Sequence, residues 1–495
     1  RALAADKARA GAGANLNPLQ RARKRPRGEA LLWRKLGVGD ALFSSYYRGQ
    51  LALGLGEPAE FQKFIGALRS ALPIALRLHP RAPASKRASL ERTLRRFGAR
   101  PLTWLPGGNG WELELDGLEP ELQKEAKRVL HEAAGSGLLC RQEAVSMLPA
   151  LVLAARPGER VLDLCASPGS KTMQLLEALG APYFANAAAP AAAAAGADAQ
   201  PAPVQKTGKR QKGAKGGMAT AHPEPAAEPD EPEDEVAEEG SGAASLLVAN
   251  DANPLRVETL AESLSRHGGR LHSPAGAALV LSCGLAQDFP LPDPSATSPP
   301  DAKARGVGFD AVLADVPCSG DGTARKDRRA LSDWAPTVGN ELHATQLAIL
   351  RRALHLARGT GGRVVYSTCS LNPVEDEAVV SAALVESAAA NAHDSSLDPS
   401  RCAPPGVTLE DACALLRARG VTCSPGVSSW RVAVMGDGGG EDADGESDDE
   451  MPALHWLDSS AEGKAHKLPN TLWPVMIYYF LFSSFFLSSS FFLSS

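Results

Sequence analysis

The chain has 495 residues, a formal net charge of −5 and eight cysteines. So few cysteines in so long a chain exclude a disulfide-stapled scaffold, and the absence of a CxxC pair argues against a zinc site. The charge is strongly segregated, because Glu224–Glu239 and Asp437–Glu450 together hold 17 acidic residues and no basic ones. The remainder carries +12, which suits a polyanionic partner such as nucleic acid, although acidic runs can also serve only to solvate linkers.

The first 130 residues divide into a basic arm and a small α+β domain. Residues 1–30 are rich in Ala, Arg and Gly, and 21–27 form a basic cluster. We expect a disordered arm there, which is either a plain tail, a nuclear localisation signal or an RNA contact. Over 31–130 we expect a domain of RNA-binding type, with a helix at Phe61–Leu72 and strands at Leu102–Leu105 and Gly110–Leu115. Because the chain begins at Arg1, we expect its natural N-terminus to lie upstream.

From residue 158 apolar β-rich runs alternate with helical patterns, which is typical of an α/β fold with a mostly parallel sheet. The predicted strands are Arg160–Cys165, Ser245–Asn250, Ala277–Ser282, Phe309–Ala314, Gly362–Ser367 and a late one at Trp430–Met435. The predicted helices are Lys171–Leu179, Pro254–His267, Leu342–Ala357 and Glu375–Ser387. Together these elements define a second domain over 131–435.

Two segments interrupt this alternation, and two more follow it. Residues 186–244 cannot bury enough apolar surface to fold, so we expect a disordered insertion there, and Gln287–Gly308 is a shorter polar loop. Residues 436–450 form an acidic linker. The tail over 451–495 repeats Phe-Phe-Leu-Ser-Ser. We expect it to be non-native coding sequence, with a genuine apolar tail or membrane anchor as the alternative.

A tight turn follows the first predicted strand of the second domain. The run Cys165-Ala166-Ser167-Pro168-Gly169-Ser170-Lys171-Thr172 is neither a Gly-x-Gly-x-x-Gly fingerprint nor a P-loop, but it presents a helix N-terminus to a ligand. Asp251 ends the second strand, where an acidic residue usually accepts ribose hydroxyls, and the alternative is a helix N-cap. Asp288 follows the third strand and could hold an adenine amino group, or be a plain loop residue.

Two cysteines follow the fourth and fifth predicted strands. Cys318 stands in the run Asp315–Thr323, and Cys369 stands in Tyr366–Pro373. Because open α/β sheets bind ligands at the carboxyl ends of their strands, both thiols are expected at the ligand-binding edge. A nucleotide-type loop with two thiols at strand ends indicates a cofactor-dependent enzyme with thiol chemistry. The other cysteines lack such a context and are expected to be structural.

These motifs resemble those of the Sun-domain RNA cytosine-5 methyltransferases. The segments that carry the resemblance are Arg141–Met147, Cys165–Thr172, Asp315–Lys326 and Tyr366–Val380. It is greatest for the eukaryotic tRNA branch, because Asp321-Gly322-Thr323 is followed by Arg325 and Lys326. The resemblance implies a class I S-adenosylmethionine-dependent methyltransferase fold, Rossmann-like, with a small N-terminal α+β domain. The family usually has Ala where Ser167 stands, a change that should not block the turn.

The resemblance also implies roles for single residues. Cys369 would attack carbon-6 of cytosine, which makes carbon-5 nucleophilic toward the methyl group of S-adenosylmethionine. Cys318 would remove the carbon-5 proton, and Asp315 would bind the Watson–Crick edge of the base. The cofactor would lie against Cys165, Ala166, Ser167, Pro168, Gly169, Ser170, Lys171, Asp251, Asp288 and Asp315. No metal is implied.

The expected substrate is tRNA, in which the target cytosine must be unstacked or looped out. Arg325 and Lys326, with Arg328 and Arg329, are expected to hold phosphates, although singly such charges are more often solvated surface residues. We expect a monomer in the nucleus or nucleolus, without membrane association. The alternatives are a ribosomal RNA methyltransferase, a DNA cytosine-5 methyltransferase and a non-catalytic RNA-binding assembly factor. The second Thr-Cys motif argues against the DNA enzyme.

Overall fold

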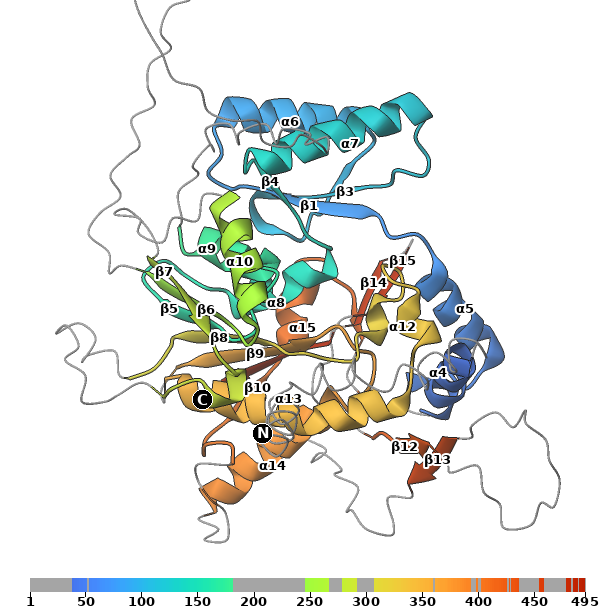
Figure 1. Cartoon of the computed structure of the whole chain (residues 1–495), viewed down its shortest axis with the longest axis vertical. Coiled ribbons are helices and arrows are strands. Elements are labelled where there is room, and N and C mark those ends of the chain that lie inside the picture. The colour runs from blue at the N-terminus through green and yellow to red at the C-terminus, as the bar shows by residue number, and fades with distance from the viewer. Residues whose placement is uncertain are drawn as a thin grey trace, which may run out of the picture. The chain divides into compact units, whose positions relative to one another are not determined.

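The computed structural model describes the chain from residue 38 to residue 494 with gaps (Figure 1). The described residues are 38–50, 53–180, 245–266, 278–291, 307–358, 361–392, 398, 402–424, 427, 429–435, 454–457, 478–481, 484–487 and 489–494. The predicted arm over 1–30, the insertion over 186–244 and the acidic linker over 436–450 lie outside them. The same holds for most of the tail over 451–495.

An antiparallel sheet of four short strands comes first in this part of the chain. Its order is β2-β3-β1-β4, with β1 at Ile74–Leu78, β2 at Arg100–Pro101, β3 at Gly110–Leu113 and β4 at Leu139–Arg141. Helices α6 (Ala84–Arg96) and α7 (Pro120–Gly135) lie side by side on one face of it (Figure 1). Their apolar stripes bury a core with the strands that includes Leu76, Leu78, Leu90, Leu94, Trp111 and Leu130.

The four-stranded unit differs in its limits from the domain expected over 31–130. It includes all of α7, which passes residue 130, and it closes with β4. The strand predicted at Leu102–Leu105 is wrong. Strand β2 ends at Pro101. The Leu102 N–H still donates to the Gly110 carbonyl at 2.8 Å, but the Leu105 N–H then donates back to the Leu102 carbonyl at 3.1 Å, so the chain turns and enters a 3₁₀ helix, η2, at Pro106–Gly108. The strand predicted at Gly110–Leu115 is confirmed as β3.

Helices α4 (Val38–Gly49) and α5 (Pro58–Arg69) belong to a different core. Their aromatic side chains pack against short α12 (Arg329–Ser332) and the residues after it. The buried members of this cluster include Phe43, Tyr46, Tyr47, Phe61, Phe64, Trp334 and Leu371. The first helices of the expected α+β domain therefore pack beside the two cysteine segments.

The second domain is built on five parallel strands in the order β9-β8-β5-β6-β7, which confirms the predicted mostly parallel α/β sheet. The strands are β5 (Arg160–Asp163), β6 (Leu246–Asp251), β7 (Ala278–Cys283), β8 (Ala311–Asp315) and β9 (Arg363–Thr368). The chain leaves β5 toward β6 on one side, and β8 pairs with β5 on the other. This reversal between β5 and β8 is the position where such sheets bind their ligands.

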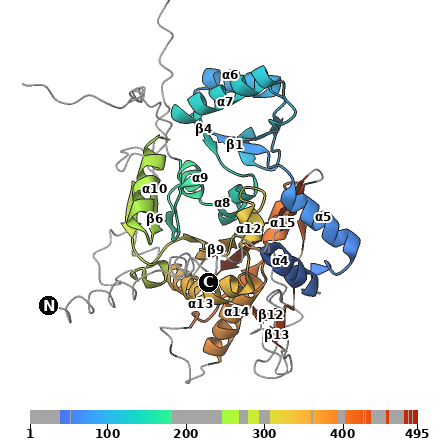
Figure 2. The same ribbon diagram turned by 45° about the vertical axis from the view of Figure 1, so that its right-hand side comes forward.

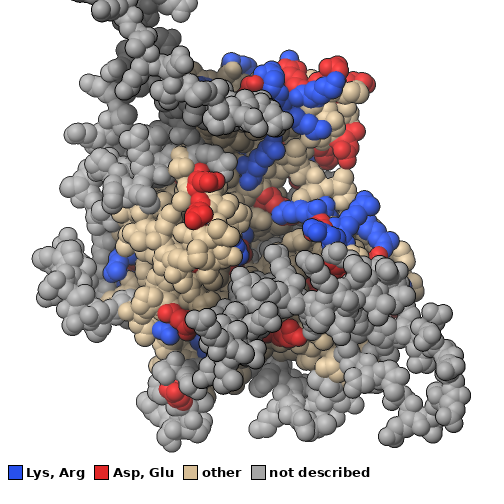
Figure 3. Space-filling view, in the orientation of Figure 1, with Lys and Arg blue, Asp and Glu red and all other residues tan. Residues whose placement is uncertain are grey.

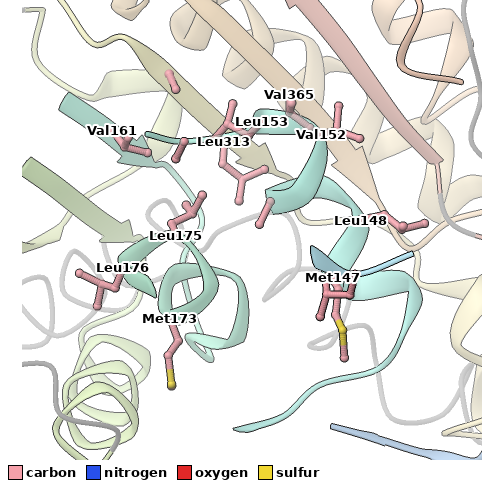
Figure 4. Close-up of a cluster of buried hydrophobic side chains, with 14 of the residues drawn as sticks. Met147, Leu148, Val152, Leu153, Val161, Met173, Leu175, Leu176, Leu313 and Val365 are labelled. Carbon is pink, nitrogen blue, oxygen red and sulfur yellow. The ribbon is translucent and has the colours of Figure 1, made fainter. Parts of the chain in front are cut away.

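Helices cover both faces of this sheet. Figures 1 and 2 show α8 (Leu148–Leu153), α9 (Ser170–Ala178) and α10 (Pro254–Arg266) on one face, and α13 (Pro336–Leu356) and α14 (Glu377–Asn391) on the other. Adjacent strand residues point to opposite faces, so Val161 packs into the first core and Leu162 into the second. Figure 4 shows the first core, in which Met147 and the apolar side chains of α8 and α9 pack with Val161, Leu313 and Val365.

Further short elements complete the described chain. The 3₁₀ helices η3 (Val145–Met147), η4 (Ala286–Asp288) and η5 (Asp321–Thr323) precede or follow main-sheet elements, and α15 (Ala412–Arg417) packs near α8. The late strand predicted at Trp430–Met435 is β12 (Val432–Met435), which pairs with β13 (Leu454–Leu457) and stays outside the main sheet. At the free edge of β9, β16 (Ser489–Ser494) and then β10 (Thr408–Glu410) pair antiparallel. A separate three-stranded sheet contains β11 (Cys423–Ser424), β14 (Tyr478–Leu481) and β15 (Ser484–Leu487).

Candidate active site

The turn between β5 and α9 is a close-packed loop. Gly169 has a φ of 105°, and a Cβ there would lie 2.9 Å from Leu260 Cδ1, so both the backbone conformation and the space require glycine. The Ser167 hydroxyl donates to the Arg256 carbonyl at 2.8 Å, and the Arg256 guanidinium donates to the Ser167 carbonyl at 2.6 Å. The serine that replaces the family's usual alanine therefore fastens the loop to α10 without blocking the turn.

Asp251 lies at the end of β6, and its side chain is almost fully buried. One carboxylate oxygen accepts from the Ser167 N–H at 3.3 Å and pairs with Arg256 at 3.2 Å. The other oxygen accepts from the Asn253 N–H at 3.0 Å. The N-cap of α10 is Asn253, whose side chain accepts from the Leu255 N–H at 3.0 Å. The N-cap reading of Asp251 is therefore wrong, and the carboxylate faces the loop after β5.

The two neighbouring strand ends carry further acidic residues. Asp288 ends η4, which follows β7 as the sequence predicted, and its side chain is exposed. Asp163 ends β5 and is fully buried; the Thr172 hydroxyl donates to one oxygen at 2.8 Å, and the other has no hydrogen-bond partner. Burial raises the pKa of Asp163 to about 7. The sequence reading did not select Asp163, although its position at the end of the first strand was a usable signal.

Lys171 and Asp315 join the loop after β5 to the end of β8. The Lys171 ammonium lies 2.8 Å from one oxygen of Asp315, and the Ser367 hydroxyl donates to the other oxygen at 2.7 Å. Burial alone would lower the pKa of Lys171, but the Asp315 carboxylate outweighs it and raises that pKa, and a Cys369 thiolate adds to the effect. The structure therefore brings together a cofactor-loop residue, a base-binding candidate and a thiol.

The two cysteines predicted at neighbouring strand ends lie in contact. Their sulfur atoms are 3.3 Å apart, and the Cys369 N–H donates to the Cys318 sulfur at 3.4 Å. Cys369 is exposed and Cys318 is half-buried. The hydrogen bond with Cys369, followed by burial, raises the pKa of Cys318. One thiol is thus presented to solvent, and the second is held directly beside it.

A buried carboxylate, Asp321, supports the Cys369 loop. It accepts from the Leu371 N–H at 2.7 Å and from the Trp334 indole at 3.1 Å, and the Tyr47 hydroxyl also donates to it. Burial raises the pKa of Tyr47, as does the charge of Asp321. Helix α4 therefore reaches the cysteine loops directly. The contact between Tyr47 and Asp321 could not be predicted from local sequence, because the two residues are 274 positions apart.

The basic residues expected to hold RNA phosphates point elsewhere. The Arg325 guanidinium donates to the Ser70 carbonyl at 3.3 Å and to the Ala71 carbonyl, and Lys326 pairs with Glu143. Arg329 is exposed and pairs with Asp327 at 2.6 Å. Arg325 and Lys326 therefore fasten the segment after η5 to the N-terminal part of the chain. Figure 3 shows Lys and Arg side chains gathered on one part of the visible face, with Asp and Glu among them.

The described residues were also considered as metal ligands and as membrane-spanning helices. Among them, no group of three or more His, Cys, Asp or Glu residues could hold a metal ion. None of their helices combines the length and apolar character needed to cross a bilayer.

A comparison with known families gives a match over residues 239–408, to the model described as "16S rRNA methyltransferase RsmB/F". This segment runs from β6 through both cysteine loops to β10. This part of the chain is therefore similar to the RsmB/F methyltransferases. The family resemblance inferred from the motifs is thereby confirmed, and the parallel sheet agrees with the fold that it implied.

The curated proteins that are similar to this chain include three from eukaryotes. The "Multisite-specific tRNA:(cytosine-C(5))-methyltransferase" of Saccharomyces cerevisiae is 36% identical over 57% of this chain and 32% of its own length. Its Schizosaccharomyces pombe counterpart, trm4b, is 32% identical over 69% of this chain and 45% of its own length. A "tRNA (cytosine(34)-C(5))-methyltransferase" of Drosophila melanogaster is 28% identical over 83% and 46%, respectively. The chain thus spans less than half of the length of each relative.

Proposed function

We propose that this chain is an S-adenosylmethionine-dependent RNA cytosine-5 methyltransferase that acts on tRNA. The observation that carries the proposal is the pair of sulfur atoms 3.3 Å apart at the ends of β8 and β9, beside the Lys171–Asp315 ion pair. Two thiols in contact suit a reaction that needs a nucleophile and a base on neighbouring atoms of one ring.

In the proposed mechanism Cys369 is the nucleophile. Its thiolate adds to carbon-6 of cytosine, which forms an S–C bond and moves electron density to carbon-5. Cys369 is the more exposed of the two thiols, so it is the one that a base can reach. Asp315 would accept a hydrogen bond from the cytosine amine through its remaining lone pairs and so orient the ring.

Cys318 is the base in this scheme. After methylation it takes the proton from carbon-5, the ring double bond reforms, and the bond to Cys369 breaks. The hydrogen bond with Cys369 and burial raise the pKa of Cys318, which favours its neutral thiol, so Cys318 must lose its own proton before it accepts the one from carbon-5. The contact between the sulfur atoms places that base at the carbon next to the one that Cys369 attacks.

The residues around β5 and β6 fit S-adenosylmethionine. The positive φ of Gly169 lets the backbone turn tightly at the start of α9, where N–H groups point toward a ligand. Asp251 is held at the end of β6, where ribose hydroxyls are usually bound, and Asp288 stands exposed at the end of η4, which follows β7. When bound, the cofactor supplies an electrophilic methyl group. The residues proposed to contact it are those predicted from the sequence, with Asp163 added.

The names of the three relatives, which are all tRNA (cytosine-C(5)) methyltransferases, favour tRNA as the substrate. The description of the matching family model, which names 16S rRNA, supports ribosomal RNA as the alternative. A non-catalytic RNA-binding assembly factor is disfavoured because both cysteines are present and in contact. Phosphate binding by Arg325 and Lys326 requires their present contacts to open. We further propose a nuclear location, on the basis of the basic cluster at 21–27. We also propose that the chain is a monomer.

Incubation of the chain with radiolabelled S-adenosylmethionine and unmodified transcripts tests this function. We expect label in tRNA, at cytosines that resist bisulfite conversion afterwards, and no label in a DNA duplex. Label in a ribosomal RNA fragment alone would replace tRNA by the alternative substrate. A folded chain that binds RNA and S-adenosylmethionine but labels neither RNA would contradict the enzymatic function.

A further inference from the structure

The two cysteine loops share a dipeptide, because Cys318 and Cys369 are each followed by a serine. Both serine hydroxyls converge on one carboxylate oxygen of Glu375, which lies 2.5 Å from Ser319 Oγ and 2.7 Å from Ser370 Oγ. The two hydroxyl oxygens are themselves 3.1 Å apart. A single oxygen atom therefore joins the loop that carries the proposed base to the loop that carries the proposed nucleophile.

The second oxygen of Glu375 strengthens this junction on the side of Cys318. It accepts from the Ser319 N–H at 2.7 Å and from the Gln346 amide at 3.1 Å, and the same amide donates to the Pro317 carbonyl at 3.0 Å. Glu375 thus faces four donor groups. An ionised carboxylate can accept from all of them. An amide at this position would turn an N–H group either toward the Ser319 N–H and the Gln346 amide, which cannot accept through their N–H groups, or toward the two hydroxyls, which would then have to accept instead of donate.

Glu375 cannot take part in the chemistry directly. Its side chain is fully buried, and its contacts with the loops are made to the serines and the backbone. From this geometry we infer that Glu375 is a positioning residue that holds Cys318 and Cys369 in register for the two steps of methyl transfer. The inference rests on the proposed function for its catalytic meaning, but the spacing it explains is a property of the structure.

The spacing of the thiols matters because attack and proton removal occur at adjacent ring carbons. A misplacement of about 1 Å can cost on the order of 100-fold in rate. A loop released from Glu375 would still contain its thiol, so binding would survive while turnover fell. This separates a positioning role from a role in binding RNA or the cofactor.

The first test compares Glu375→Gln with Glu377→Gln. Glu377 is an equally buried carboxyl on the same segment, but it accepts a hydrogen bond from the Val427 N–H at 2.9 Å, away from both cysteine loops. We expect Glu375→Gln to lower kcat at least about tenfold with the KM values for tRNA and S-adenosylmethionine within about threefold. Glu377→Gln should keep wild-type kinetics. Equal kcat values in the two variants would overturn the inference.

Milder variants cover the case in which Glu375→Gln does not fold. Ser319→Ala removes the hydroxyl contact of the Cys318 loop with Glu375 and should raise the fraction of enzyme trapped as a covalent RNA adduct, because product release slows. Ser370→Ala removes the hydroxyl contacts of the Cys369 loop with Glu375 and Asp321 and should slow adduct formation instead. If both variants form and release the adduct at the wild-type rate, the junction has no positioning role.

A measurement without RNA separates this inference from the proposed function. Diamide oxidises two thiols to a disulfide, and their two hydrogen atoms reduce its N=N bond to a hydrazine. The rate of Cys318–Cys369 disulfide formation, followed by peptide mass spectrometry, therefore reports how the thiols are held. We expect Glu375→Gln to slow it at least about fivefold relative to Glu377→Gln, since approach geometry controls thiol exchange. An unchanged rate in a folded variant would overturn the positioning role, whereas a slowed rate in a chain that methylates no RNA would overturn the proposed function alone.

Discussion

Charged side chains serve two different purposes in the cysteine loops and in the four-stranded unit. Around the loops, Asp321 and Glu375 are fully buried and accept several hydrogen bonds each. On α6 and α7, most pairs are exposed, such as Arg128 with Glu132 and Lys124 with Glu121. Water screens the exposed ion pairs, whereas the buried carboxylates are fixed by the fold and stabilise it through their hydrogen bonds. Substitution should therefore have large effects near the loops and small ones on the helices.

The largest effect on stability is expected from Asp321→Ala. The change leaves the Leu371 N–H, the Trp334 indole and the Tyr47 hydroxyl without their buried acceptor. At 1–3 kcal/mol for each unsatisfied group, we expect a loss of about 4–5 kcal/mol in the free energy of unfolding. Urea unfolding followed by fluorescence measures it. A loss below 1 kcal/mol would mean that water replaces the carboxylate and that the site is not tightly closed.

A smaller loss is expected where the two sheets are linked. Arg77 on β1 pairs with Glu177 on α9 at 3.1 Å, and both side chains are nearly fully buried. Burial raises the pKa of Glu177 to about 7 even with this partner. Arg77→Met should cost about 3–4 kcal/mol, because it leaves a buried carboxyl without its cation. The double variant Arg77→Met/Glu177→Leu should regain most of that in the same urea assay. If the double variant is as unstable as the single one, packing rather than charge is responsible.

Glu377 predicts a pH dependence of opposite sign to that of an ordinary ion-paired carboxyl. Burial raises its pKa from 4.5 to about 8. Between these values the native state keeps a proton that the unfolded state releases, so this group's contribution is full below pH 4.5 and is lost as the pH rises through 8. Glu377→Gln should gain about 3–4 kcal/mol over the wild type as the pH rises from about 5 to 8. Thermal unfolding across this range measures it, and a pH-independent difference would contradict the raised pKa.

The smallest effect is expected on the exposed face of α7. Arg128→Ala removes a pair in which both side chains are more than half exposed. We expect a change of at most about 0.5 kcal/mol in unfolding, which salt should reduce further. A loss similar to that of Arg77→Met would show that the contrast between the two regions is misplaced.

The sequence predicted the parts of the molecule that are set by local pattern. The apolar runs at Arg160–Cys165, Ser245–Asn250 and Phe309–Ala314 predicted parallel strands, and the turn around Gly169 predicted the start of α9. The same patterns placed Cys318 and Cys369 at neighbouring strand ends, and the contact between their sulfur atoms agrees with that placement. Strand identity and strand end are properties of a few adjacent residues, so a single sequence carries them.

What the sequence could not give depends on contacts between distant segments. Tyr47 reaches Asp321 from α4, and Arg325 turns toward Ser70 and Ala71 rather than toward solvent. Glu375 looked like the start of a helix and proved to be the acceptor that joins two loops. In each case the partner lies on another element, and the residue's own neighbours do not reveal it. The strand predicted at Leu102–Leu105 failed for a local reason, since the Leu105 N–H donates back to the Leu102 carbonyl and closes a turn there.

The central claim is that Cys369 attacks the base and Cys318 releases it. The most direct measurement is to mix Cys318→Ala and Cys369→Ala separately with tRNA and S-adenosylmethionine and to run each on a denaturing gel. We predict that Cys318→Ala accumulates a covalent protein–RNA adduct that survives denaturation, and that Cys369→Ala forms none and transfers no methyl group. An adduct with Cys369→Ala and none with Cys318→Ala would reverse the two roles, and full turnover by either variant would contradict the thiol mechanism.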